Sequence, residues 1–155
     1  MRGTSASSAY STYGYDPATG AVLAIKDNAV FGGAGHYVAD RSFTRDAVGN
    51  VTSSTVSATH PQTQTQKTCY TYDGLRQLTR AWTPNASATC ADAASAATLG
   101  DPAPMWVDYA YDMATGNRTS VTSHSSMGST STRAYEYPVA GDDQVLWISK
   151  VSSDE

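Results

Sequence analysis

The fold of this chain is decided by a short pattern that recurs along it, most completely at Tyr109-Ala110-Tyr111-Asp112-Met113-Ala114-Thr115-Gly116-Asn117. Tyr-x-Tyr places both rings on one face of a strand, because side chains alternate between faces along a strand. Asp112 stands where the strand ends, and its carboxylate can accept hydrogen bonds from main-chain N–H groups two or three residues further on. Gly116 supplies the positive φ that lets the chain reverse. The pattern therefore predicts the tip of a β-hairpin.

Three further segments share this pattern. Residues 13–20 and 70–76 keep both tyrosines and the aspartate, whereas 43–50 has Phe and Arg in place of the tyrosines. A fifth segment, 135–141, keeps the aromatic residues and the glycine but has no aspartate. The four aspartates follow one another at intervals of 30, 27 and 39 residues. The residues expected to build the four tips are Tyr13, Tyr15, Asp16 and Gly20; Phe43, Asp46 and Gly49; Tyr70, Tyr72 and Asp73; and Tyr109, Tyr111, Asp112 and Gly116.

A strand-like segment follows each tip and is expected to return along the hairpin; these segments are 22–25, 51–56, 75–79 and 117–121. Stretches rich in Ser, Thr, Gly and Asn predict longer loops at 28–35, 59–66 and 123–132. The apolar residues of 145–151 predict one more strand near the end. The chain is therefore predicted to be all-β, with about nine or ten antiparallel strands in consecutive hairpins that form a curved open sheet.

The region between the third and fourth tips differs from the rest. It is rich in alanine and is bracketed by Pro84, Pro102 and Pro104. At most one short helix is expected here, near residues 91–99, with Cys90 or Asp92 as its N-cap and glycine after its end. The predicted organisation is a flexible N-terminal segment at 1–12, a hairpin array at 13–151 and a polar tail at 152–155.

Composition supports an all-β chain and excludes some partners. Charged residues make up only 15% of the chain, and ten Tyr outnumber two Phe, so residues that suit half-buried pleated surfaces replace the usual helix formers. The ten Lys and Arg are scattered and the net charge is −4, which argues against binding to a nucleic-acid backbone. The longest apolar run, 21–25, is too short to span a bilayer, and no signal peptide is recognisable at the start.

The candidate chemical sites have simpler structural explanations. The repeated aspartates could be calcium ligands, but Ca²⁺ needs six to eight oxygens, and each repeat offers one carboxylate beside aromatic residues; we expect turn caps. His36, His60 and His124 lack metal-ligand spacing, and no nucleophile elbow or phosphate loop is present. We expect no catalytic residue, no metal and no cofactor, and hence no enzyme. The two cysteines, Cys69 and Cys90, allow either a disulfide bond or two separate buried thiols.

The aromatic residues leave one alternative open. A ladder of tyrosines, together with Trp82, Trp106 or Trp147, could stack on sugar rings and make the chain a cell-surface carbohydrate-binding or adhesion module. Aromatic residues at repeat spacing are more often the packing between neighbouring hairpins, and we prefer that interpretation.

The segments 72–78 and 111–118 resemble the YD repeat, which is roughly Tyr-x-Tyr-Asp, a short turn, Gly-Arg/Asn-Leu and a Thr-rich strand. YD repeats build the bacterial Rhs polymorphic-toxin proteins, the shell subunits of bacterial toxin complexes and the teneurins of animals. The residues around Cys69, Trp82, Cys90 and Trp106 resemble, in order, a segment common in Rhs proteins of actinobacteria. The resemblance covers most of the chain, roughly residues 13–151.

This resemblance implies a structural function. Rhs repeats wind into a β-sheet spiral that forms a hollow shell around a toxic C-terminal polypeptide, so the chain would be a section of that wall without activity of its own. Its partners would be neighbouring repeats and the enclosed toxin, with a cell-surface glycan as the alternative partner. The parent protein would be secreted or displayed on the cell surface. The resemblance also favours the Cys69–Cys90 bridge, which would enclose a loop insert.

Overall fold

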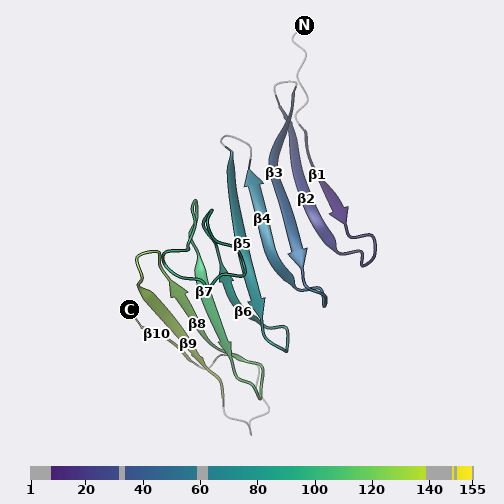
Figure 1. Cartoon of the computed structure of the whole chain (residues 1–155). Helices are drawn as coiled ribbons and strands as arrows, with labels where there is room; N and C mark the ends of the chain where they lie inside the picture. Colours follow the sequence, from purple (N-terminus) through teal and green to yellow (C-terminus); the bar gives the residue numbers. More distant parts are fainter. Residues whose placement is uncertain (1–7, 32–33, 59–62, 139–147, 149, 155) are drawn as a thin grey trace. The chain divides into compact units, whose positions relative to one another are not determined.

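The computed structural model describes residues 8–31, 34–58, 63–138, 148 and 150–154. These residues form ten β-strands and no helix. Every strand pairing among them is antiparallel, and strands that follow one another along the chain are neighbours (Figure 1). The predicted all-β fold of consecutive hairpins is confirmed. The chain divides into two compact units, Met1–Cys69 with Asp101–Ala103, and Tyr70–Gly100 with Pro104–Glu155.

The first unit holds five strands in chain order. They are β1 (Ser8–Tyr15), β2 (Val22–Phe31), β3 (Ala34–Arg45), β4 (Val51–Ala58) and β5 (Gln64–Tyr72), of which the last three residues belong to the second unit. The ladders shift register where a hairpin approaches its tip, between Gly14 and Tyr15 and again between Thr44 and Arg45. Such bulges bend a strand and increase its twist.

The second unit continues the pattern with β6 (Leu78–Trp82), β7 (Trp106–Tyr111), β8 (Arg118–His124), β9 (Thr130–Glu136) and β10 (Lys150–Ser153). Its small core lies where β6 passes into the insert of residues 83–105. Ala81, Trp82 and Thr83 are at most 4% exposed there. Most other described side chains are half-buried or exposed, as expected for hairpins that cover only their neighbours.

The insert is closed by main-chain hydrogen bonds at its base. Thr83 donates to the carbonyl of Met105 at 2.8 Å, and Gly100 donates to the carbonyl of Thr83 at 3.0 Å. A side chain at Gly100 would collide with the main chain of Pro84 and Asn85, which explains a glycine at this position.

The alanine-rich part of the insert forms turns, and the short helix that the sequence allowed at 91–99 is absent. The carboxylate of Asp92 accepts hydrogen bonds from the N–H and hydroxyl of Thr89, and the hydroxyl of Thr98 accepts one from the N–H of Ser95. These local side-chain bonds hold main-chain groups in turns, which compete with a helix.

Several expected boundaries are wrong. β1 begins at Ser8, inside the segment 1–12 that we expected to be flexible, and residues 1–7 lie outside the described part. Two loops are shorter than predicted, because β2 runs to Phe31 and β3 starts at Ala34, while β5 already starts at Gln64. The third, at 123–132, is a five-residue turn between His124 and Thr130.

The structure describes only some of the residues of the C-terminal strand and tail that the sequence predicts. Of the strand predicted at 145–151, residues 150 and 151 lie in β10; residues 145–147 and 149 lie outside the described part. The polar tail predicted at 152–155 begins inside this strand, since β10 extends to Ser153. The N–H of Asp154 then donates to the carbonyl of Thr132 at 3.0 Å.

Candidate functional site: hairpin corners and the links between hairpins

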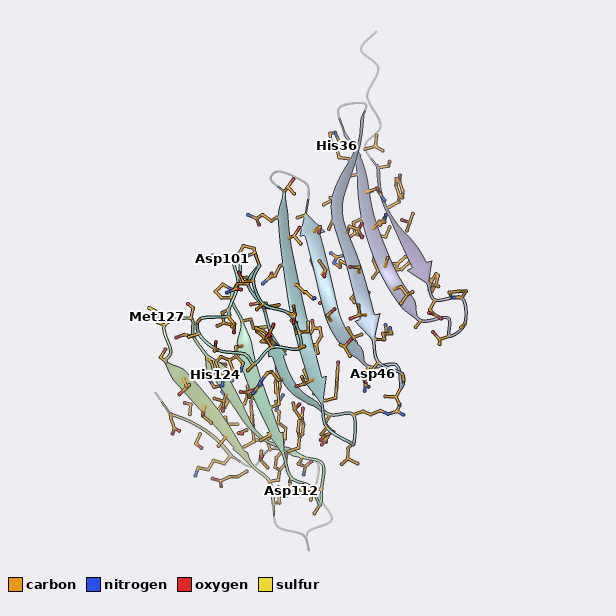
Figure 2. All side chains as sticks on the ribbon, viewed as in Figure 1. His36, Asp46, Asp101, Asp112, His124 and Met127 are labelled. Carbon is orange, nitrogen blue, oxygen red and sulfur yellow. The ribbon has the colours of Figure 1, made fainter. Side chains whose placement is uncertain are left out.

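All four repeated aspartates lie at the corner where the first strand of a hairpin ends, and Figure 2 labels two of them, Asp46 and Asp112. At every corner the aspartate N–H donates to a carbonyl across the turn, and the aspartate carbonyl accepts from a residue three or four positions later. That later residue has a positive φ in each case: Gly20 (71°), Gly49 (94°), Arg76 (64°) and Gly116 (73°). The four corners therefore share one main-chain hydrogen-bond pattern, in a longer and a shorter form.

The corners at Asp16 and Asp112 are the same in detail. In each, one carboxylate oxygen accepts from the N–H groups two and three residues ahead, at 2.7–3.0 Å, and from the hydroxyl of the threonine at the third position. These hydrogen bonds favour the charged carboxylate, so the N–H and hydroxyl of Thr19 hold the pKa of Asp16 below its ordinary value, and those of Thr115 do the same for the pKa of Asp112.

The corners at Asp46 and Asp73 are one residue shorter. Asp46 accepts from the N–H groups of Val48 and Asn50, at 3.1 and 2.8 Å. Asp73 accepts from those of Leu75 and Gln77, at 2.9 and 2.8 Å. In both, the carboxylate satisfies N–H groups that face no strand.

A fifth corner of the shorter kind joins β8 and β9, and the sequence pattern did not reveal it. Here Ser125 replaces the aspartate: its N–H donates to the carbonyl of Ser129, its hydroxyl accepts from the N–H of Ser129 at 3.1 Å, and its carbonyl accepts from Gly128, whose φ is 84°. Serine four residues before another serine, with a glycine between them, was the available signal.

In three hairpins a side chain at the end of the first strand, or one residue beyond it, contacts the preceding hairpin. Tyr111, the last residue of β7, donates its hydroxyl to the carbonyl of Leu78, the first residue of β6, at 2.9 Å. Tyr137, one residue beyond β9, donates to the carbonyl of Arg118, the first residue of β8, at 3.0 Å. Burial raises the pKa of Tyr111. We call such a hydrogen bond, from a side chain near the end of one hairpin's first strand to the first residue of the preceding hairpin's returning strand, the corner link.

Arginine makes the same link in the first unit. Arg45 is the last residue of β3, and its guanidinium donates to the carbonyl of Val22, the first residue of β2, at 3.3 Å. It also donates to the carbonyl of Gly49 at 2.9 Å, whereas its buried Nε has no acceptor among the described residues. A long donor side chain, aromatic or cationic, thus serves at the link position.

The first tyrosine pair differs from the others. Tyr13 and Tyr15 stack with ring centroids 6.4 Å apart, and they are 54% and 59% exposed. The other predicted aromatic residues, Phe43, Tyr70, Tyr72, Tyr109 and Tyr111, are half-buried. None of the described residues accepts the hydroxyl of Tyr15, although it occupies the link position of its hairpin.

A cavity of about 660 Å³ lies between the corners of Asp16 and Asp46, with Leu23, Phe43 and Val48 in its lining. In the second unit, the corresponding space between the corners of Asp73 and Asp112 is crossed by a side chain: Gln77 donates to the carbonyl of Gly116 at 2.9 Å. Ala21 stands at the equivalent position of the first corner and is too short to cross.

A polar cluster on β6, β7 and β8 was also missed by sequence reasoning. Asp108 accepts from Arg80 at 2.5 Å and from the Trp106 indole at 3.1 Å, and its carboxylate lies 3.0 Å from His124 Nε2. His124 stacks on Trp106 with ring centroids 3.8 Å apart. Arg80, the pair of Trp106 and Asp108, and His124 lie on three strands that are far apart in sequence, so only the strand register Arg80–Asp108 and Trp106–His124 brings them together.

The remaining predicted groups can be placed directly. Cys69 and Cys90 are disulfide-bonded, which confirms the expected bridge. Trp82 is 1% exposed, Trp106 is covered by His124, and Trp147 lies outside the described residues. Within the described ranges, no group of three or more His, Cys, Asp or Glu could hold a metal ion, and no helix is long and apolar enough to cross a membrane. No protein-family model and no curated protein matches the chain.

Proposed function

We propose that this chain is a structural segment of a YD-repeat shell of the Rhs kind, whose parent protein is secreted or displayed at the cell surface and encloses a C-terminal toxin. The observation that carries the proposal is the recurrence of two contacts, the aspartate corner and the corner link. Asp16, Asp46, Asp73 and Asp112 share the corner geometry, and Arg45, Tyr111 and Tyr137 share the link.

These two repeated contacts are suited to building an extended wall of hairpins. Each link joins a hairpin to its predecessor alone, so hairpins can be added without a central core. The described residues agree with an assembly that has no large central core, since only a few side chains, such as those of Cys69, Trp82 and Thr83, are fully buried. The segment would contribute surface and no chemistry, with neighbouring repeats and the enclosed polypeptide as its partners.

The experiment uses the parent protein and follows protease digestion of the polypeptide downstream of the repeats. We expect the intact parent to protect that polypeptide, and Tyr111→Ala to open the wall and expose it. Met113→Ala is the control, because Met113 is 95% exposed at the same corner and should leave protection unchanged. Equal digestion of the downstream polypeptide in the intact parent and in isolation would refute the shell.

One observation favours a second candidate function, a cell-surface carbohydrate-binding or adhesion module. Tyr13 and Tyr15 present stacked and exposed rings, which is the arrangement that a sugar ring could pack against. Tyr13→Ala with Tyr15→Ala should abolish binding on a glycan array while the fold survives if this candidate is right. Tyr72→Ala with Tyr111→Ala should instead unfold the chain if the half-buried tyrosines are packing residues.

A further inference from the structure

The two terminal strands of the described fold have complementary free edges. Among the described strands, β1 pairs with β2 alone and β10 pairs with β9 alone. β1 is the first strand of a hairpin, whereas β10 returns beside β9. Within the described strands, β1 is therefore not paired with the returning strand of a preceding hairpin, and β10 is not paired with the first strand of a following one.

The pairings inside the chain show how such edges meet. β3 pairs with β2, β7 with β6 and β9 with β8, so the first strand of a hairpin lies beside the returning strand of the hairpin before it. Each of these three junctions carries a corner link, made by Arg45, Tyr111 or Tyr137. The same arrangement is available to β1, because Tyr15 stands at its link position with an exposed ring.

The edge of β1 also lacks the features that normally prevent association. Exposed edge strands are usually protected by charged residues, by proline or by a short length. β1 has eight residues, all exposed, with the sequence Ser-Ala-Tyr-Ser-Thr-Tyr-Gly-Tyr and neither a charge nor a proline. On β10, the one charge is Lys150, which is already paired with Glu136 at 3.2 Å.

We propose that β1 of one copy receives β10 of a second copy, as an antiparallel strand addition in which the Tyr15 hydroxyl donates to a main-chain carbonyl of the incoming strand. The contact is heterologous, because different edges of the two copies meet, so it propagates head to tail and does not stop at a dimer. The proposal rests on the repeat geometry in the proposed function and is independent of any toxin.

Edge-blocked variants of the full chain distinguish this pairing from association of like edges. Thr12→Lys with Tyr13→Lys places two charges on β1, and Val151→Lys with Ser152→Lys places two on β10; all four positions are exposed. Met113→Lys with Met127→Lys is the charge-matched control, at corners 95% and 92% exposed. Sedimentation velocity over a concentration series gives the size distribution, and circular dichroism checks that each variant is folded.

We expect the unmodified chain and the control to form a ladder of oligomers that grows with concentration. Each blocked variant alone should be monomeric, because it keeps only one of the two edges that pair. In an equal mixture, the free β10 of the variant blocked at β1 should pair with the free β1 of the variant blocked at β10. The resulting one-to-one dimer has both remaining edges blocked and should grow no further. A blocked variant that dimerises by itself, a monomeric unmodified chain, or a mixture that stays monomeric would each overturn the proposal. If protease protection in the parent still held, the shell would survive this failure.

Tyr15→Phe tests the link within the same assay. Removing one hydrogen bond should weaken association about fivefold, since a typical bond of this kind contributes about 1 kcal/mol. Tyr10→Phe is the matched control, because Tyr10 is 55% exposed on the same strand but away from the link position. Equal association of the two variants would contradict the role of the Tyr15 hydroxyl.

Discussion

The hydroxyl of Tyr111 donates a hydrogen bond to the carbonyl of Leu78 at 2.9 Å, which joins the end of β7 to the start of β6. The corresponding side chains Arg45 and Tyr137 reach the first residues of β2 and β8. Arg45 and Tyr111 come directly before an aspartate corner, whereas Tyr137 lies one residue beyond the end of β9. Among the described residues, this contact joins neighbouring hairpins once in the first unit and twice in the second.

Loss of the Tyr111 hydroxyl should destabilise the chain. Tyr111→Phe keeps the ring but leaves the Leu78 carbonyl without this donor, so we expect the free energy of unfolding to fall by about 1 kcal/mol. Urea denaturation measures the change. Tyr13→Phe is the control, because that ring is 54% exposed, and it should change the midpoint little. Equal losses in the two variants would show that the contact with Leu78 contributes nothing.

Acid should unfold the chain partly through its corners. Hydrogen bonds from Thr19 and Thr115 lower the pKa of Asp16 and Asp112 in the folded chain, so the unfolded chain binds protons at a higher pH than the folded one. Their contribution is complete above the unfolded pKa and is lost as pH falls below about 4 through the folded pKa. Asp16→Asn with Asp112→Asn keeps the acceptors without the charge.

Thermal melting between about pH 6 and pH 2 tests this linkage. The melting temperature of the double variant should fall less steeply with acid than that of the unmodified chain. Ser125→Ala, at the one described corner that has no carboxylate, should lower the melting temperature by the same amount at every pH. Parallel acid profiles for the aspartate variant and the unmodified chain would exclude the corners as the titrating groups.

The third corner should be improved by glycine. Arg76 has φ 64°, which is unfavourable for a residue with a Cβ, and glycine stands at the equivalent position of the other three aspartate corners. We expect Arg76→Gly to raise the free energy of unfolding by about 0.5 kcal/mol, because relief of strain exceeds the added entropy of the unfolded chain. Gly49→Ala, at φ 94°, is the reciprocal variant and should destabilise in the same denaturation assay.

The contact that Gln77 makes in the second unit should be reproducible across the cavity between the first two corners. Ala21→Gln alone should gain little, because Arg45 already occupies the Gly49 carbonyl. Together with Arg45→Tyr, the glutamine can cross to Gly49 as Gln77 crosses to Gly116. A double-mutant cycle should show favourable coupling of about 1 kcal/mol, and additive effects would contradict the equivalence of the two corner pairs.

The tips and the strand order were predictable because their signals are local. Aromatic alternation, an aspartate and a glycine within eight residues determine a corner, and short connections determine that successive strands pair. Asp16 and Asp112 have nearly identical surroundings because they share Ala-Thr-Gly after them. The Ser125 corner escaped notice because serine is common in this chain, so its position carried little information.

The long-range contacts could not be predicted in the same way. The cluster of Arg80, Trp106, Asp108 and His124 depends on the register between β6, β7 and β8, and a shift of one residue would turn these side chains to the opposite face. Because the insert of residues 83–105 separates β6 from β7, the sequence does not show which of their residues are paired. The Tyr111–Leu78 contact likewise spans 33 residues, and the pattern alone does not identify its acceptor.

Amide hydrogen exchange followed by NMR tests the central claim most directly, which is that the four aspartates mark one common corner. The N–H groups of Gly20, Gly49, Arg76 and Gly116 donate to the carbonyls of their corner aspartates, and the aspartate N–H groups donate back across the turn. All eight amides should therefore exchange slowly, while the N–H of Met113, which donates to no described group, should exchange quickly. Exchange at unfolded-peptide rates in two or more of the four corners would contradict the account.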